Sequence, residues 1–267
     1  MDLRRLEVER EGPILRVHLN RPERHNALDT TALEEIAELF GGLQRDFEAR
    51  VVVLGGRGSS FCAGADRKDP PGASRLVAGS GAGERERRFV SQLGRRACRA
   101  IEAAEAVSIA RLHGHVVGGG LALALACDFR VAARDALLHV PEVDLGVPLT
   151  WGAAPRLIHE VGAARARELL LLCDRIDAER AERWGLVHRV VEPGELDDAV
   201  DDWARRLAAK PEVAVHMTKT QLRALAARAA LGDVTEADGD LLAGAFRAGV
   251  ARSSFSAGPG GSREPSS

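Results

Sequence analysis

The sequence predicts an α/β core followed by a helical C-terminal part. Up to Thr150, short runs of β-branched residues alternate with segments of helical period. After Thr150 helical periods dominate, and only residues 186–191 still favour a strand. The 267 residues suit one large domain, or one domain with a smaller appendage.

The first segments predict two strands, a helix and a third strand. Leu6–Arg10 and Ile14–Leu19 favour strands, and a Glu-Gly-Pro turn separates them. Asp29 can cap a helix whose apolar residues recur at helical spacing. Val51–Leu54 is a short β-branched run before two glycines, which is typical of a buried strand. This order predicts a right-handed crossover unit.

The middle of the chain contains one long break in the pattern. Residues 69–83 are rich in Pro, Gly, Ala and Ser, and we expect this segment to be mobile. A charged helix is predicted over 84–104, before a strand at 107–112. Further short strands are predicted at Phe129–Ala132 and Leu137–Val140.

The C-terminal part is predicted to be helical over 197–209, 212–229 and 240–250. The last 15 or so residues are rich in Ser, Gly and Pro, which is typical of disorder. We expect three parts with no obvious linker: a core over 1–195, a helical part over 196–252 and a disordered tail over 253–267.

Composition excludes several function classes. With 37 basic and 39 acidic residues the net charge is −2, which argues against nucleic acid or a membrane surface as the main partner. The chain has no Tyr, so no phenol takes part in catalysis. Its four cysteines are widely spaced without a CxxC pair, which disfavours a zinc site or a disulfide framework. No apolar signal region or membrane-spanning run is present, so we expect a cytoplasmic protein.

Two glycine-containing loops are the strongest candidates for a functional site. Phe61–Lys68 follows the strand at 51–54, and His113–Gly120 follows the strand at 107–112 and precedes a small, apolar segment. A strand, a Gly-rich turn and a helix can aim backbone N–H groups at a developing negative charge. The GxxxxGK[ST] phosphate loop and the GxGxxG dinucleotide fingerprint are both absent.

Five segments, in this order, resemble the enoyl-CoA hydratase/isomerase (crotonase) family. The resemblance covers roughly residues 5–250, and the order and spacing of the segments agree with the family. The segments are Asn20–Leu28 (NRPERHNAL), Phe61–Lys68 (FCAGADRK), Gly118–Gly120 (GGG), Val140–Gly146 (VPEVDLG) and Ala178–Val191 (AERAERWGLVHRVV).

The resemblance implies both a fold and a binding mode. The family fold is a spiral of ββα units whose C-terminal helices build trimers, often paired into hexamers. The core over 1–195 would then bind an acyl-CoA thioester. The residues that match the family's oxyanion hole are Ala65 and Gly119, whose backbone N–H groups would hold the thioester oxygen. One such donor typically contributes about 2.7–4 kcal/mol to catalysis.

The first loop also resembles the part of the family site that binds coenzyme A. The residues carried over are Arg24, Ala63, Gly64, Asp66, Arg67 and Lys68. For the three cations among them, solvated surface charge is an equal alternative. No metal or redox cofactor is expected, because coenzyme A is part of the substrate.

The reaction depends on how many glutamates the site has. Hydratases of the family carry two, and this chain has Ala122 where the first is expected, while Glu142 matches the second. A single carboxylate can move a proton between two carbons, so the resemblance implies an enoyl-CoA isomerase that shifts a double bond from the 3- to the 2-position. Two alternatives stay open: an acyl-CoA-binding protein without catalysis, and a hydratase that recruits another group. The dienoyl-CoA isomerases match poorly, because Thr150 stands where they have an aspartate.

Other polar residues have less specific interpretations. Cys62 lacks a suggested His-Asp partnership, so packing is favoured over nucleophilic catalysis. His113 and His115 would share a face, but no third metal ligand is evident. His139 and Trp151 are candidates for the lining of an acyl pocket, which the segment over 69–83 is expected to border.

Overall fold

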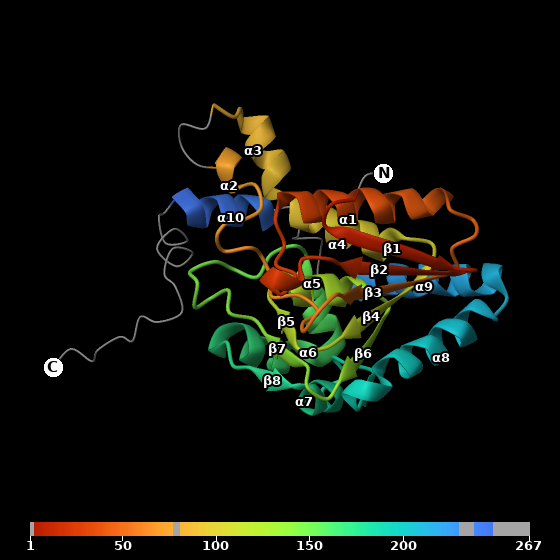
Figure 1. Ribbon diagram of the computed structural model, residues 1–267. Coiled ribbons are helices and arrows are strands. Elements are labelled where there is room, and N and C mark those ends of the chain that lie inside the picture. Colours follow the sequence, from red (N-terminus) through yellow and green to blue (C-terminus); the bar gives the residue numbers. More distant parts are fainter. Residues whose placement is uncertain (1–2, 77–80, 230–237, 248–267) are drawn as a thin grey trace.

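The computed structural model describes residues 3–76, 81–229 and 238–247 (Figure 1). Its largest element is a six-stranded sheet in which the first pair is antiparallel and all other neighbours are parallel. In spatial order the strands are β1 (Leu6–Glu11), β2 (Ile14–Leu19), β3 (Val51–Gly56), β4 (Val107–Leu112), β6 (Phe129–Ala133) and β9 (Arg189–Val191). The predicted strands of the first 133 residues are thus confirmed.

A second sheet has three short strands: β5 (His115–Val117), β7 (Leu137–His139) and β8 (Ile176–Asp177). β4 leads into β5 and helix α5 (Gly119–Ala126), and β6 leads into β7 and the later helix α6 (Ala153–Leu172). β6 pairs with β4, and β7 pairs with β5. Successive ββα units therefore stack in the same order along both sheets, which is the spiral arrangement that the resemblance implied.

Helices cover both faces of the large sheet (Figure 1). Alternate residues of β3 point to opposite faces, as expected for a strand buried on both sides. Val52 and Leu54 belong to the cluster that contains α1 (Thr30–Gly42) and α4 (Leu93–Ala103). Val51 and Val53 belong to the cluster that contains α8 (Leu196–Ala208). The predicted cap of α1 is confirmed, because the Asp29 carboxylate accepts a hydrogen bond of 2.8 Å from the N–H of Ala32.

Three predicted elements differ from the structure. The helix over 84–104 is two helices, α3 (Glu84–Ser91) and α4, because the backbone leaves helical geometry at Gln92. The strand expected at 186–191 is only three residues long, since the N–H groups of Leu186 and Val187 bond to the carbonyl of Ala181 in the turn after α7 (Ala178–Arg183). Within the segment expected to be mobile, the structure has a short helix, α2 (Ala73–Leu76).

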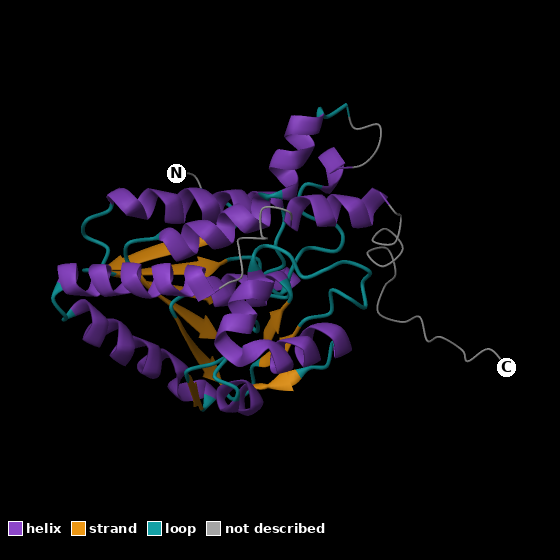
Figure 2. Cartoon of the chain, turned by 180° about the vertical axis from the view of Figure 1, so that it is seen from behind, coloured by secondary structure: helices purple, strands orange, loops and turns teal. Residues whose placement is uncertain are grey.

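The C-terminal helices agree with the sequence prediction to within a few residues. α8 is followed by α9 (Glu212–Ala229) and α10 (Asp238–Arg247), and in the rear view helices cover the strands (Figure 2). Lys219 attaches α9 to the core through Nζ contacts of 2.8 Å to the Ala106 carbonyl and 2.7 Å to the Asp128 carboxylate. None of the described helices is both long enough and apolar enough to cross a membrane. Residues 77–80 and the predicted disordered tail lie outside the described residues, and the three-part division stays a prediction.

One buried cation joins several elements of the core. Arg130 of β6 is only 1% exposed. Its guanidinium donates hydrogen bonds to the carbonyls of Leu186 at 2.7 Å and Cys127 at 2.9 Å. It also donates a bond of 2.6 Å to the Glu160 carboxylate on α6. Arg130 therefore satisfies backbone carbonyls that no water reaches, while one carboxylate balances its charge.

Candidate active site

The two glycine-containing loops lie side by side. An isolated parallel bridge pairs Cys62 with Val116, and the backbone bonds on either side of this bridge measure 2.9 Å and 3.0 Å. A Cβ on Gly64 would lie 2.8 Å from the carbonyl oxygen of Val117, so only glycine permits this close approach. The first loop thus reaches the start of α5.

A cavity of about 330 Å³ opens where these loops meet. The first loop, the start of α5 and the segment over 141–151 all line it. The residues that line the cavity and were singled out from the sequence are Ala63, Gly64, Ala65, Arg67, Gly118, Gly119, Ala122, His139, Glu142, Thr150 and Trp151. The structure therefore brings together the principal residues that the resemblance implied.

The backbone N–H groups of Ala65 and Gly119 are available to a ligand. Within the described part of the chain, neither group donates a hydrogen bond. The neighbouring groups are occupied, since Asp66 donates to the carbonyl of Leu28 and Gly118 donates to the carbonyl of His139. Gly119 is also the first residue of α5, where the helix dipole favours negative charge. Two unused donors beside one cavity are what an oxyanion requires.

Trp151 lines the cavity beside Gly119, as the sequence analysis expected of a residue that lines an acyl pocket. Its backbone is left-handed, with φ of 62°, and its indole lies against two glycines. A Cβ added to Gly94 would lie 2.0 Å from the indole ring, and one added to Gly119 would lie 2.4 Å from it. Gly94 was not predicted as a site residue, because a single glycine inside a helix gives no signal of what packs against it.

Glu142 has a carboxylate with one buried oxygen that lacks a partner. Its Oε2 atom has no contact with solvent and no hydrogen bond within the described part of the chain. Burial raises the pKa of Glu142 from its usual 4.5 to about 7. A Cβ on Gly118 would lie 2.4 Å from Oε1, so the carboxylate sits against the start of α5. A carboxyl group with a near-neutral pKa therefore lines the same cavity as the two free N–H groups.

The position of a second carboxylate is occupied by an apolar side chain. Ala122 lines the cavity and is 1% exposed. Among the described residues that line the cavity, Glu142 is the only acidic one. Asp144 is exposed and does not line it. The arrangement thus offers one proton carrier where two would be needed to hold and split a water molecule.

The proposed coenzyme A residues divide into two groups. Ala63, Gly64 and Arg67 line the cavity, whereas Arg24 and Lys68 are exposed side chains outside its lining.

Asp66 serves the loop itself. It is buried, and its carboxylate accepts bonds from the N–H of Lys68 at 2.9 Å and from Arg21 at 3.0 Å. Burial alone would raise the pKa of Asp66, but these donors and the N–H of Asp69 outweigh it and hold the pKa below its usual value.

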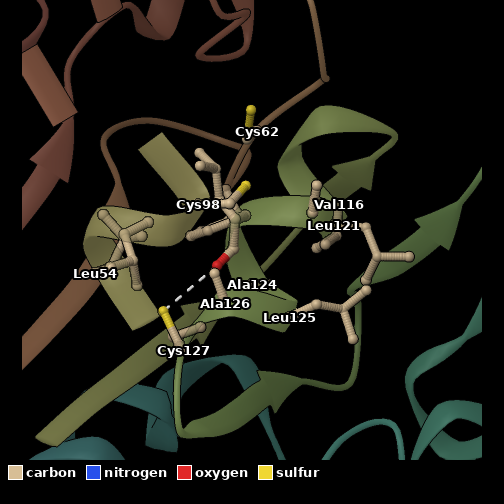
Figure 3. Packing of buried hydrophobic residues seen from close by; sticks show 14 of the residues in the cluster. Leu54, Cys62, Cys98, Val116, Leu121, Ala124, Leu125, Ala126 and Cys127 are labelled. Carbon is tan, nitrogen blue, oxygen red and sulfur yellow. Dashed lines mark hydrogen bonds between the residues drawn. The ribbon is translucent and has the colours of Figure 1, made fainter. Parts of the chain in front are cut away.

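Cys62 is a packing residue in this structure. Burial raises the pKa of its thiol to about 12, so the reactive thiolate is not populated near neutral pH. Figure 3 shows Cys62, Cys98 and Cys127 among aliphatic side chains of the core. The sequence preference for packing over nucleophilic catalysis is consistent with this environment.

His113 and His115 are engaged in local contacts. His113 Nε2 lies 3.0 Å from the Gly58 carbonyl, and His115 Nδ1 lies 3.0 Å from the Ser60 hydroxyl. No group of three potential metal ligands occurs in the described ranges.

The cavity also has a wall that sequence analysis missed. Arg175, in the turn between α6 and β8, lines it together with the first loop's own cation, Arg67. Pro70 and Pro71 contribute from the segment that was expected to border the pocket. Arg175 gave no signal in the sequence, because it is one of many arginines and lies 33 positions after Glu142 in the chain.

Comparisons with known proteins identify the family of this chain. A family model described as enoyl-CoA hydratase/isomerase matches residues 9–256. The chain is 34% identical over 220 residues to the short-chain-enoyl-CoA hydratase of Clostridium acetobutylicum, which covers 82% of this chain and 81% of that protein. It is 37% identical over 213 residues to the crotonyl-CoA hydratase of Syntrophomonas wolfei, with coverages of 79% and 78%. A solved enoyl-CoA hydratase/isomerase from Mycobacterium paratuberculosis superposes with a TM-score of 0.86 at 25% identity, covering 96% and 99% of the two chains.

Proposed function

This chain belongs to the enoyl-CoA hydratase/isomerase family, and we propose that it moves the double bond of an enoyl-CoA from the 3- to the 2-position. Glu142 is the single acid/base in this proposal. The observation that carries it is the Glu142 carboxylate, whose buried Oε2 has no hydrogen-bond partner among the described residues. Glu142 lines the same cavity as the free N–H groups of Ala65 and Gly119.

The first step removes a proton from the carbon next to the thioester. Glu142 takes this proton as a carboxylate, and the electron pair moves through the carbonyl to leave a dienolate. Negative charge then develops on the thioester oxygen. The N–H groups of Ala65 and Gly119 donate to that oxygen, and each donor lowers the barrier by about 2.7–4 kcal/mol.

The second step returns the same proton to the chain at the far end of the dienolate. The neutral Glu142 carboxyl donates it to C4, and the double bond is left between C2 and C3. No atom is gained or lost, so the reaction needs no cofactor and no water. A pKa near 7 suits both steps, because the group must accept a proton and then give it back.

The loop over 61–68 is proposed to border the coenzyme A moiety. Ala63, Gly64 and Arg67 support this assignment, because they line the same cavity as Ala65. Arg24 and Lys68 are exposed and would contact only a part of the ligand that extends beyond the cavity.

Hydration is the second candidate function. The relatives in Clostridium acetobutylicum and Syntrophomonas wolfei are named as hydratases, which favours it. Ala122 opposes it, because an alanine cannot orient water or transfer a proton. A hydratase would therefore need another group in place of the missing carboxylate.

The wild-type protein distinguishes these functions when it is assayed with two substrates. We expect conversion of 3-hexenoyl-CoA to 2-hexenoyl-CoA to exceed hydration of crotonyl-CoA by at least about 100-fold in kcat/KM. Faster hydration of crotonyl-CoA would overturn the proposal in favour of a hydratase. Tight binding of hexanoyl-CoA without turnover of either substrate would instead show an acyl-CoA-binding protein without catalysis.

A further inference from the structure

One arginine at the cavity has no hydrogen-bond or ion-pair partner among the described residues. Arg67 and Arg175 both line the cavity, but Arg67 already interacts with another residue. Arg175 makes no hydrogen bond or ion pair within the described part of the chain. Two carboxylates are close to Arg175 in the sequence, those of Asp174 and Asp177. The Asp177 carboxylate accepts a hydrogen bond from the N–H of Arg180 instead.

The short strands place Arg175 beside His139. β7 and β8 are antiparallel, with Leu137 opposite Asp177 and Leu138 opposite Ile176. If this register is continued by one position, His139 comes opposite Arg175, which directly precedes β8. Directly opposite residues of an antiparallel pair project from the same face, and His139 also lines the cavity.

The imidazole of His139 is held in one neutral form. Its Nε2 lies 3.0 Å from the carbonyl of Cys173, which can only accept, so Nε2 carries the hydrogen. Burial lowers the pKa of His139, and the charge of Arg175 lowers it further. The bond to the Cys173 carbonyl and the exposed Asp144 act in the opposite direction, but burial outweighs them and the pKa is lowered. His139 is thus a neutral neighbour that does not neutralise the guanidinium.

The proposed role of Glu142 assigns His139 and Arg175 to the acyl side of the cavity. Glu142 must reach carbons of the acyl chain if it is the acid/base, and His139 precedes it by three residues at the end of β7. The N–H of Gly118 donates to the carbonyl of His139, which places β7 against the start of α5. The first loop, proposed to border coenzyme A, supplies Arg67 instead.

From these observations we infer that Arg175 binds a carboxylate at the end of the acyl chain. The substrate class is then the coenzyme A monothioester of an unsaturated dicarboxylic acid. A guanidinium can hold a carboxylate through two parallel N–H···O bonds, which fixes both position and orientation. The inference deepens the proposed function, since it assigns the acyl side of the cavity from the role of Glu142.

Binding of saturated thioesters tests the inference without any chemical step. Glutaryl-CoA and valeryl-CoA have the same chain length and differ in one terminal carboxylate, as do adipyl-CoA and hexanoyl-CoA. We expect wild type to bind the carboxylate member of at least one pair about tenfold more tightly by calorimetry. Arg175→Gln removes this preference and leaves the affinity for the methyl-terminated member within about twofold.

Controls separate the carboxylate from other anions. Arg175 and Arg183 are both exposed arginines, but Arg183 does not line the cavity, and Arg183→Gln should keep the preference. An equal loss of affinity for all four thioesters and for free coenzyme A in Arg175→Gln would show that Arg175 binds a phosphate, and would overturn the inference. The absence of any carboxylate preference in wild type would overturn it as well. Because these ligands do not react, failure of the isomerase proposal cannot produce either result.

Discussion

The protonation of Glu142 links its surroundings to the rate of the proposed reaction. Burial raises its pKa to about 7, and this outweighs the lowering by a hydrogen bond from its own backbone N–H. Only the ionised carboxylate can take the first proton. As the pH falls below 7, the ionised fraction therefore decreases about tenfold per pH unit.

The corresponding prediction concerns the pH profile of isomerisation. We expect kcat/KM for 3-hexenoyl-CoA to rise with pH to a midpoint near 7 and then to level off. The affinity for hexanoyl-CoA, measured over the same range, serves as the control for binding. A flat profile from about pH 5.5 to 8.5, with binding unchanged, would contradict the assignment of Glu142.

Ala122 provides a gain-of-function prediction. Ala122→Glu places a second carboxylate in the cavity, and we expect hydration of crotonyl-CoA to rise at least about tenfold. Ala122→Gln fills the same volume without a proton to transfer, so hydration should stay at the wild-type level. Equal hydration by both variants, with both folded by circular dichroism, would show that the missing carboxylate is not what limits hydration.

At the scale of elements, Trp151 packs against α4 and α5 next to the N–H group of Gly119. Its indole lies against Gly94 of α4 and Gly119 of α5, where any Cβ would lie within about 2.5 Å of the ring. The backbone geometry of Gly119 therefore depends on a contact between two helices. A substitution in α4 should therefore alter the position of the Gly119 N–H group, which belongs to the backbone and cannot be removed by a side-chain substitution.

Two helical glycines make a matched pair for this prediction. Gly94→Ala must displace Trp151, and overpacking of this kind typically costs about 1–3 kcal/mol of the free energy of unfolding. We expect kcat to fall more than tenfold with it. Gly41 of α1 is exposed, and a Cβ there would meet open space. Gly41→Ala should therefore raise the free energy of unfolding by up to about 1 kcal/mol and leave kcat unchanged. Unfolding in urea and steady-state kinetics measure both quantities; wild-type kcat in Gly94→Ala would refute the coupling.

The elements show what the sequence could and could not predict. Val51–Leu54 and the positions of α1 were predictable, because a fully buried strand and a capped amphipathic helix have strong local signatures. β5 and β8 were missed, since strands of three and two residues carry too little periodicity. The break at Gln92 was missed because no Pro or Gly marks it.

The candidate site was predictable only as far as its motifs extend. Resemblance located Ala65, Gly119 and Glu142, and the structure places all three at one cavity. The burial of Glu142 Oε2 without a partner depends on packing and cannot be read from a motif. The same is true of Arg175, which reaches the cavity through the pairing of β7 with β8.

For the whole molecule, Arg130 offers a test of how the core is held together. Its guanidinium joins β6, the turn at Leu186, the end of α5 and α6. Arg130→Met leaves buried carbonyls without donors, and we expect a loss of about 3 kcal/mol or more in the free energy of unfolding.

An exposed arginine gives the control for this loss. Arg134 pairs with Glu179 and Glu192 at the surface, so Arg134→Met should leave the free energy of unfolding close to that of wild type. Similar losses in both variants, measured by denaturant titration, would mean that Arg130 does not hold the core. The predicted trimer or hexamer stays a prediction.

The most direct test of the account is 3-hexenoyl-CoA isomerisation by Glu142→Gln, with hexanoyl-CoA affinity measured on the same sample. Glutamine keeps the size of the side chain but cannot accept the proton. The account predicts a fall in kcat of at least about 1,000-fold, with affinity within about threefold of wild type. Isomerisation at more than about a tenth of the wild-type rate, with binding intact, would contradict the central role of Glu142.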